Sequence, residues 1–145
     1  MIRAFLFILV TISISDSIAQ SNDSTTLSKE ELIFVFEKYQ KAQDNTFRAG
    51  SLISDIDELY SFYTDDFEYN HPKYGGIYTR EHLYNNTVKF LKEGRYANSK
   101  KRLTLNRIVG LDAIVIEQQY EGRSETTMTL FKFRKDKIYY IEEYW

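Results

Sequence analysis

The C-terminal third of the chain constrains the fold most, because it consists of four consecutive segments rich in β-branched and aromatic residues. These segments span residues 100–109, 112–121, 125–134 and 137–145, and only short turns containing Gly or Asp separate them. Consecutive strands joined by short turns pair as antiparallel hairpins. The pattern therefore predicts a meandering antiparallel sheet.

Both faces of these strands carry apolar residues. In the last strand, strict alternation would place Ile138 and Tyr140 on one face, and Tyr139 and Ile141 on the other. A sheet that is apolar on both faces has to be covered on both. Helices from the rest of the chain can cover one face, so we expect a second copy of the chain against the other.

Three helices are predicted ahead of this sheet, which together with it indicates an α+β fold. The first spans about 28–45 and begins with the capping-box spacing of Ser28 and Glu31. The second begins near Ser54, and the acidic pair at 65–66 is expected to end it, because carboxylates disfavour a helix C-terminus. Its apolar side is formed by Ile56, Leu59, Tyr60 and Tyr63.

A short strand over residues 67–71 is predicted between the second and third helices. Phe67, Tyr69 and His71 alternate there with polar residues, and Pro72 ends the run. The third helix is predicted to begin after a Thr79 cap and to end at Gly94.

The N-terminus predicts an exported protein. Residues 1–19 combine a basic start, a short apolar run and a small-x-small cleavage site, as a secretory signal peptide does. The run is too short for a good membrane span, so none is expected after cleavage. Residues 20–27 predict a polar, frayed leader. Residues 28–145 predict one domain, exported to a periplasm or to the outside.

Composition excludes several classes of protein. The net charge of −2 and the absence of a basic stripe argue against a nucleic-acid binder. The absence of Cys excludes disulfides and thiolate chemistry. No metal-ligand spacing, phosphate loop or dinucleotide fingerprint is present, so neither a metal nor a cofactor is predicted. We interpret the small basic cluster at 100–102 as a solvated strand edge.

Aromatic residues are unusually frequent in the predicted domain. The chain has 12 Tyr, 10 Phe and 1 Trp, and only Phe5 and Phe7 lie in the predicted signal peptide. Such a density requires a large core, a pocket or a buried interface.

Two segments resemble a known superfamily. One runs from Asp55 to Pro72 and contains an acidic pair, an apolar helix, Phe-Tyr-Thr-Asp-Asp and a short strand ending in His71-Pro72. The other is the closing segment Lys137–Trp145. Both resemble the nuclear transport factor 2-like superfamily, particularly its SnoaL-like and ketosteroid-isomerase-like members. This resemblance implies a cone-shaped, cystatin-like roll, in which a strongly bent antiparallel sheet wraps around three N-terminal helices and encloses a ligand cavity. It also implies a homodimer through the outer sheet face.

The resemblance draws attention to His71. In the isomerase branch, the residue directly before this proline is the catalytic carboxylate base. An imidazole can also move protons near neutral pH. The alternative interpretation of His71 is a hydrogen-bonding residue of the pocket wall that orders a ligand. Glu143 is expected on the cavity face of the last strand, where it would pair with His71. The alternatives are a structural ion pair with an Arg or Lys and exposure to solvent at the end of the strand.

Two further positions correspond to the oxyanion donors of that branch. Tyr39 lies in the part of the first helix that supplies a Tyr, although its place in an apolar stripe also suits ordinary packing. The position of the second donor, a protonated Asp, is occupied here by Thr129, which counts against steroid-type isomerisation. The cavity is further expected to be lined by Tyr63, Gln118, Phe133 and Trp145.

Two classes of function follow from these observations. The first is a non-catalytic exported domain that binds a small apolar or aromatic molecule in its cavity. The second is a cofactor-independent isomerase, lyase or cyclase in which His71 acts as general base and Glu143 orients it. A purely structural dimer would instead have its cavity filled by side chains.

Overall fold

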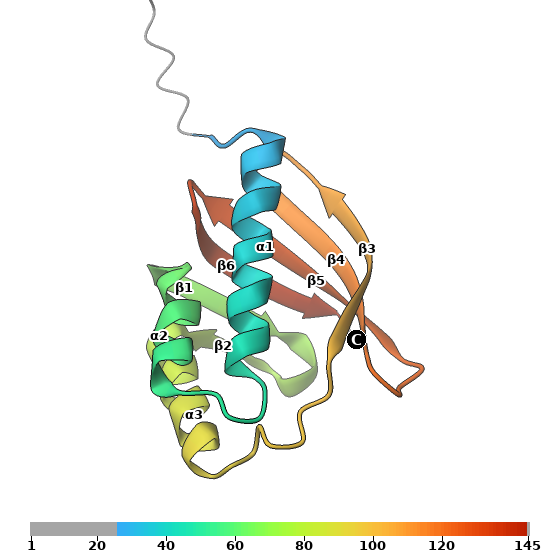
Figure 1. Ribbon diagram of the computed structural model, residues 1–145. Coiled ribbons are helices and arrows are strands. Elements are labelled where there is room, and N and C mark those ends of the chain that lie inside the picture. Colours follow the sequence, from blue (N-terminus) through green and yellow to red (C-terminus); the bar gives the residue numbers. More distant parts are fainter. Residues whose placement is uncertain (1–25, 145) are drawn as a thin grey trace, which may run out of the picture.

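The computed structural model describes residues 26–144, which form an α+β fold of three α-helices and one six-stranded sheet (Figure 1). The signal peptide predicted over 1–19, most of the predicted leader, and Trp145 lie outside the described residues. The helices are α1 (Lys29–Thr46), α2 (Ile53–Ser61) and α3 (Arg80–Lys92), with a 3-10 turn η1 (Pro72–Tyr74). The strands are β1 (Tyr63–His71), β2 (Gly76–Thr79), β3 (Arg102–Val109), β4 (Ala113–Tyr120), β5 (Thr126–Arg134) and β6 (Lys137–Tyr144).

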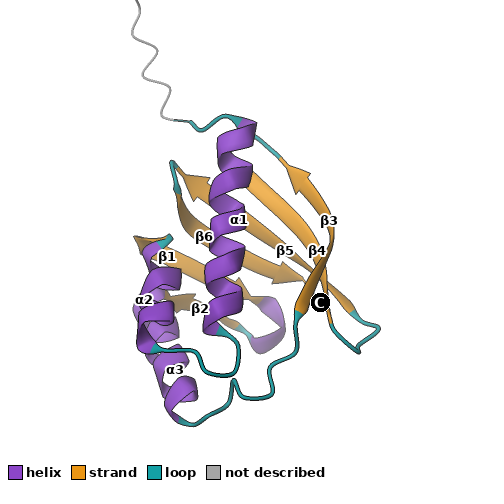
Figure 2. Ribbon diagram, viewed as in Figure 1, coloured by secondary structure: helices purple, strands orange, loops and turns teal. Residues whose placement is uncertain are grey.

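The sheet has the strand order β2-β1-β6-β5-β4-β3 (Figure 2). Strands β3 to β6 pair as antiparallel neighbours, which confirms the predicted meander. The hairpin of β1 and β2 joins it through a parallel pairing of β1 with β6. The sequence does not predict β2, because Gly76 suits a turn and Thr79 suits a helix cap, which leaves only two residues between them.

Local capping signals at the helix starts are confirmed. The Ser28 hydroxyl accepts from the Glu31 backbone N–H at 3.2 Å, and the Ser28 N–H donates to the Glu31 carboxylate at 2.8 Å. The Thr79 hydroxyl caps α3 by accepting from the His82 N–H at 3.3 Å. Gly94 follows the last turn of α3 with a φ of 68°, a conformation that favours glycine.

Helix α1 lies across one face of the sheet, here called the inner face (Figure 1). Phe36 is completely buried there, with ring centroids 5.0 Å from Phe131 and 6.5 Å from Phe133. Leu27, the last residue of the predicted leader, packs partly buried against this core and so already belongs to the fold.

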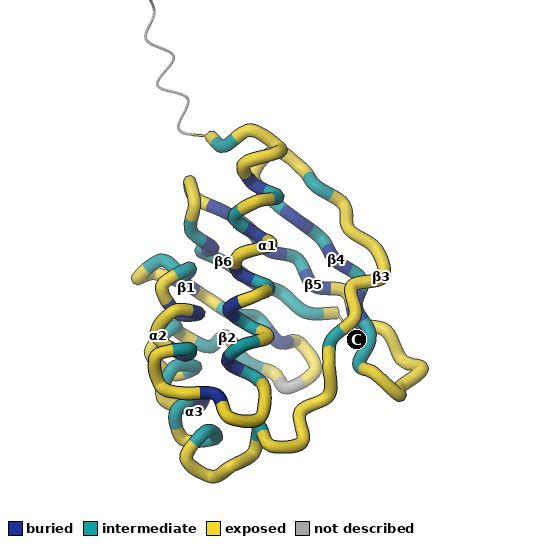
Figure 3. The backbone as a smooth tube through the Cα atoms, viewed as in Figure 1, coloured by how far each residue is buried: buried dark blue, intermediate teal, exposed yellow. Residues whose placement is uncertain are grey.

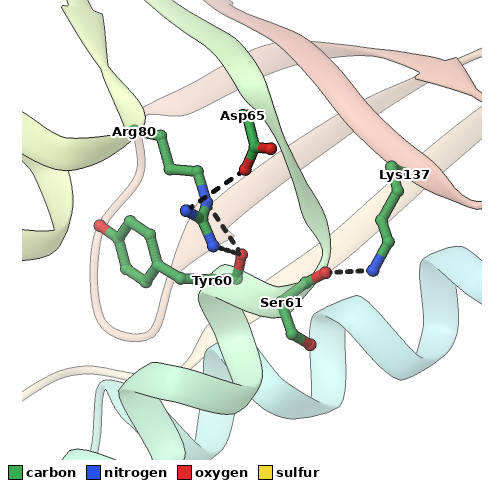
Figure 4. Close-up of polar contacts among 5 residues, drawn as sticks. All are labelled: Tyr60, Ser61, Asp65, Arg80 and Lys137. Carbon is green, nitrogen blue, oxygen red and sulfur yellow. Dashed lines mark hydrogen bonds and ion pairs between the residues drawn. The ribbon is translucent and has the colours of Figure 1, made fainter.

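The boundary between α2 and β1 differs from the prediction. The helix ends at Ser61, and Tyr63 and the acidic pair at 65–66 belong to β1 instead. Two cations donate hydrogen bonds to the last carbonyls of α2, as Figure 4 shows. Arg80 donates to the Tyr60 carbonyl at 3.1 and 3.3 Å, and Lys137 donates to the Ser61 carbonyl. These cations from α3 and β6 stabilise the C-terminus of α2 at Ser61. The helix therefore ends one turn before the acidic pair that was expected to end it.

The last strand also departs from strict alternation. Phe133 pairs with Ile138 and Lys132 pairs with Tyr140, so Tyr139 is the extra residue of a β-bulge. As a result Ile138 and Ile141 are both buried on the inner face, whereas alternation predicted them on opposite faces. Glu143 lies beyond the bulge and shares the inner face with Ile141, as alternation predicts.

Most residues of β3, the edge strand, are exposed (Figure 3). The side of the sheet opposite α1, here called the outer face, carries apolar side chains in solvent. Leu103 and Ile108 on β3, Met128 on β5 and Tyr144 on β6 are 39%, 71%, 51% and 45% exposed. No helix among residues 26–144 has the length and apolar character needed to cross a membrane.

Candidate ligand site on the inner face of the sheet

A cavity of about 460 Å³ lies between the inner face of the sheet and the helices. Aromatic residues are the largest group in its walls, and side chains do not fill the cavity as a purely structural dimer would require. The rings come from the helices, the sheet and two connecting segments: Tyr39, Phe47, Tyr60, Tyr63, Phe67, Tyr69, Tyr96, Tyr120 and Phe131.

Four polar side chains cross the inner face as a row, one from each of four adjacent strands. Gln118 comes from β4, Thr129 from β5, Glu143 from β6 and His71 from β1, and all four line the cavity. Thr129 lies opposite Glu143 in the β5–β6 register, and the Gln118 amide donates to the Thr129 hydroxyl at 3.1 Å. We call these residues the polar row.

His71 and Glu143 form the charged end of the polar row. The Nε2 atom of His71 lies 3.7 Å from Oε2 of Glu143, an ion-pair contact when the imidazole is protonated but longer than a hydrogen bond. The side chains are only 7% and 16% exposed. Burial raises the pKa of Tyr69 well above its usual value, and the charge of Glu143 and a hydrogen bond to it raise this pKa further. Glu143 thus contacts two proton-bearing groups in the cavity wall.

A second polar cluster lies on the helical side of the cavity. The Gln43 amide donates to the Tyr39 hydroxyl at 3.0 Å, and that hydroxyl lies 3.2 Å from the Tyr63 hydroxyl. Burial raises the pKa of Tyr39 to about 12, while the hydrogen bond to Tyr63 and the positive charge of Arg102 oppose the shift. Both phenols therefore remain neutral hydrogen-bonding groups at physiological pH.

Six of the predicted site residues meet around this cavity: Tyr39, Tyr63, His71, Gln118, Thr129 and Glu143. Phe133 does not line it, because it is buried one register step away against Phe36 and Ile138. Trp145 lies outside the described residues.

Sequence reasoning missed several cavity residues. Gln43 lies one helical turn after Tyr39, a spacing that places the two side chains on one face. Tyr69 lies two residues before His71 on the same strand face, which alternation alone indicates. Arg102, interpreted as part of a solvated edge, instead lines the cavity and is half-buried. No signal along the chain indicated that Arg102 lines the cavity, because its position depends on β3 pairing with β4 at the edge of the sheet, next to α1.

No group of three or more His, Cys, Asp or Glu side chains that could hold a metal ion occurs within residues 26–144.

Comparisons with known proteins rest on structure alone. No protein-family model matches the sequence, and no curated protein matches it. Solved structures do match. A SnoaL-like protein of unknown function from Burkholderia thailandensis has a TM-score of 0.61 at 15% identity, covering 82% of this chain and 97% of that chain.

Two further structures match a similar share of the chain. One, from Catenulispora acidiphila, has a ketosteroid isomerase-like fold and was solved with trimethylamine; its TM-score is 0.52 at 15% identity, over 77% of this chain and 84% of that chain. The other, a candidate polyketide cyclase from Sinorhizobium meliloti, has a TM-score of 0.54 at 14% identity, over 81% and 100%. The protein therefore has the fold of the nuclear transport factor 2-like superfamily, which its SnoaL-like and ketosteroid-isomerase-like members share.

Proposed function

We propose that this protein binds a small apolar or aromatic molecule in the cavity on the inner face of its sheet. The observation that carries the proposal is the combination of an unfilled cavity of about 460 Å³, aromatic walls and one row of convergent polar groups. Ligand sites in proteins typically have volumes of about 300–1,000 Å³ and a few polar groups among apolar walls. The cone-shaped enclosure implied by the family resemblance is part of this proposal.

The division of the walls supports an aromatic ligand in particular. The rings of Tyr63 and Phe67 are stacked at 4.1 Å, and Tyr60 meets Tyr63 edge-on at 5.3 Å, so the rings hold one another in place. Rigid aromatic walls favour flat, apolar ligands, because edge and face contacts add to the burial of apolar area. The polar row then supplies hydrogen bonds at one side of the cavity.

Ligand capture followed by native mass spectrometry tests this proposal. The protein is incubated with cell extract, repurified and measured for retained small molecules. In the variant Gln118→Trp, an indole occupies the cavity; in the control Gln119→Trp, the neighbouring residue on the opposite face of β4 is changed. Wild type and Gln119→Trp should retain a ligand that Gln118→Trp loses. Retention by all three proteins, or by none, would refute the proposal.

An alternative function is suggested by the charged end of the polar row. His71 lies directly before Pro72 and 3.7 Å from Glu143, so it can accept a proton from a ligand while Glu143 stabilises the resulting imidazolium. The names of two similar structures also support this alternative, because one is a candidate polyketide cyclase and the other has a ketosteroid isomerase-like fold. Under this alternative, the protein is a cofactor-independent isomerase, lyase or cyclase.

The two functions differ in what His71→Asn does to a captured compound. If the protein is an enzyme, His71→Asn abolishes conversion of that compound and leaves its retention in the mass spectrum. If the protein only binds, wild type does not convert the compound at all. Conversion that persists in His71→Asn would eliminate His71 as the base.

We further propose that the protein is exported and forms a homodimer through the outer face. The signal-peptide pattern of residues 1–19 supports export, and the mature N-terminus, measured by intact mass after expression with these residues, should begin at Gln20. Exposed Leu103, Ile108 and Met128 support the dimer, because several large apolar side chains in solvent on one face of a sheet are typical of an interface.

A further inference from the structure

One end of the cavity, here called the opening because its residues Ser99 and Lys100 are exposed, carries a local positive charge. A hollow of about 210 Å³ adjoins the cavity and shares Phe47, Ser99, Lys100 and Arg102 with it. The charged residues lining this hollow are Arg48, Lys100, Lys101 and Arg102, opposed by the single carboxylate of Asp44. The chain as a whole has a net charge of −2, so this opening differs in sign from the rest of the molecule.

Three segments that are distant in sequence build this opening. They are the end of α1, the connection from α3 to β3, and the first residue of β3, which lie together in Figure 1. The Phe47 and Tyr96 rings meet at 5.2 Å, which joins the first two segments, and the Arg102 guanidinium lies 5.3 Å from the Phe47 ring. Gln40 donates to Thr104 at 3.0 Å and holds β3 against α1.

Arg102 is the more buried of the two cations, Lys100 and Arg102, that line the cavity. It is half-buried, lies opposite Tyr120 in the β3–β4 register, and lines the cavity as well as the adjoining hollow. Its charge acts inside the cavity, because it lowers the pKa values of Tyr39 and Tyr63 against the effect of burial. Among residues 26–144, Arg102 forms no ion pair with a carboxylate. Other arginines do form such pairs: Arg80, Arg107 and Arg134.

We propose that the ligand of this cavity is an amphiphilic organic anion, whose apolar or aromatic body lies among the rings and whose oxyanion group contacts Arg102 at the opening. This proposal rests on the proposed binding function and names its ligand class. A guanidinium held in place beside an aromatic ring is suited to a carboxylate, sulfonate or phosphate, to which it can donate two parallel hydrogen bonds. The surrounding lysines raise the local concentration of anions at the opening.

A pair of fluorescent probes that share one ring system tests the proposal. 8-Anilinonaphthalene-1-sulfonate carries a sulfonate, and N-phenyl-1-naphthylamine is the same framework without it. Wild type should bind the anionic probe about tenfold more tightly than the neutral one, as expected for a charge-assisted contact. Each probe should displace the other, and added salt should weaken only the anionic probe.

Substitutions at two arginines of β3 locate the effect. Arg102→Gln should weaken the anionic probe about tenfold and change the neutral probe less than about twofold, whereas Arg102→Lys should retain part of the preference. Arg107→Gln is the control, because Arg107 pairs with Glu37 outside the cavity at 3.2 Å. Thermal unfolding of each variant shows whether the fold is retained, and Arg102→Lys and the salt dependence test the proposal if Arg102→Gln unfolds.

The outcomes separate this proposal from the function on which it rests. If wild type binds the neutral probe as tightly as the anionic one, or if Arg102→Gln leaves their ratio unchanged, the anion preference is refuted and the binding cavity stands. If wild type binds neither probe, the proposed binding function fails, and the anion proposal fails with it.

Discussion

The two faces of the sheet are built from the same strands but reverse the usual distribution of residues. The inner face is buried, and yet it holds the polar row of Gln118, Thr129, Glu143 and His71. The outer face is in solvent, and yet apolar side chains such as Ile108 and Met128 extend from it. Buried polar groups and exposed apolar groups both cost free energy in an isolated domain.

We propose that this difference reflects a separate partner for each face. On the inner face, the polar groups cluster at a cavity, while the rest of that face packs tightly against α1 through Phe36. On the outer face, polar groups such as Asn70 and Glu142 bond to each other at 3.0 Å beside the apolar residues. The cavity of the inner face supports the proposed small-molecule ligand, and the exposed apolar residues of the outer face support the proposed homodimer.

The largest expected effect is on the free energy of unfolding. It distinguishes a side chain of α1 that packs against the inner face from one that is exposed on the same helix. Phe36→Ala should reduce the free energy of unfolding by about 3–5 kcal/mol, because it removes a completely buried ring from the contact with Phe131. Phe34, two residues earlier, is 58% exposed with Lys38 over its ring at 4.2 Å, so Phe34→Ala should cost no more than about 1 kcal/mol. Urea unfolding followed by circular dichroism measures both, and equal losses would contradict this view of the core.

The outer face is tested next by placing a charge on it. Met128→Glu should weaken the proposed dimer at least about 100-fold, because association would bury an unpaired carboxylate. Phe34→Glu introduces the same charge at a similarly exposed apolar position on α1, and it should leave the dimer intact. Sedimentation equilibrium at micromolar concentration gives the mass of each protein. A monomeric wild type, or a dimeric Met128→Glu variant, would argue against this interface.

The buried phenols of the inner face predict a loss of stability in alkali. The pKa of Tyr39 is raised from 10 to about 12 in the folded protein, so the folded state favours the neutral phenol. The stabilisation that follows from this shift is complete below pH 10 and is lost as the pH rises through 12. At pH 12 the loss in the free energy of unfolding amounts to about 2 kcal/mol. In Tyr39→Phe, the free energy of unfolding should fall less steeply over that range. Chemical denaturation at several pH values measures the slope, and a slope equal to that of wild type would exclude this origin.

The smallest expected effect concerns the polar row itself. Thr129→Val removes the acceptor of the Gln118 amide and should cost about 1–2 kcal/mol, because a buried donor then has no partner. The double variant Thr129→Val/Gln118→Met should recover part of this loss, since both polar groups are then absent. A double-mutant cycle in urea measures the coupling, and strictly additive losses would show that the two side chains do not interact.

Features that depend on neighbouring residues were predictable from the sequence. The capping box at Ser28 and the turns between β3, β4, β5 and β6 act within a few residues, and the structure has them where the pattern placed them. The positions of His71, Gln118 and Glu143 on one sheet face followed from strand alternation and from the family resemblance.

Features that depend on distant pairing were not predictable. Tyr63 fits the apolar stripe of α2, but its pairing with Ile138 of β6 draws it into β1. The residues around Tyr139 give no local sign of a bulge. Arg102 lines the cavity only because β3 pairs with β4 at the edge of the sheet, beside α1. In each case a contact formed across the sheet outweighs a local preference.

Methyl NMR during a titration with N-phenyl-1-naphthylamine tests the division between the two faces most directly. The methyl groups of Ile141 and Leu59 line the cavity, whereas those of Ile108 and Met128 lie in solvent on the outer face. We predict that Ile141 and Leu59 shift with a single saturable binding curve, while Ile108 and Met128 stay unchanged. Shifts at Ile108 and Met128 without shifts at Ile141 and Leu59 would contradict the assignment of the ligand to the inner face.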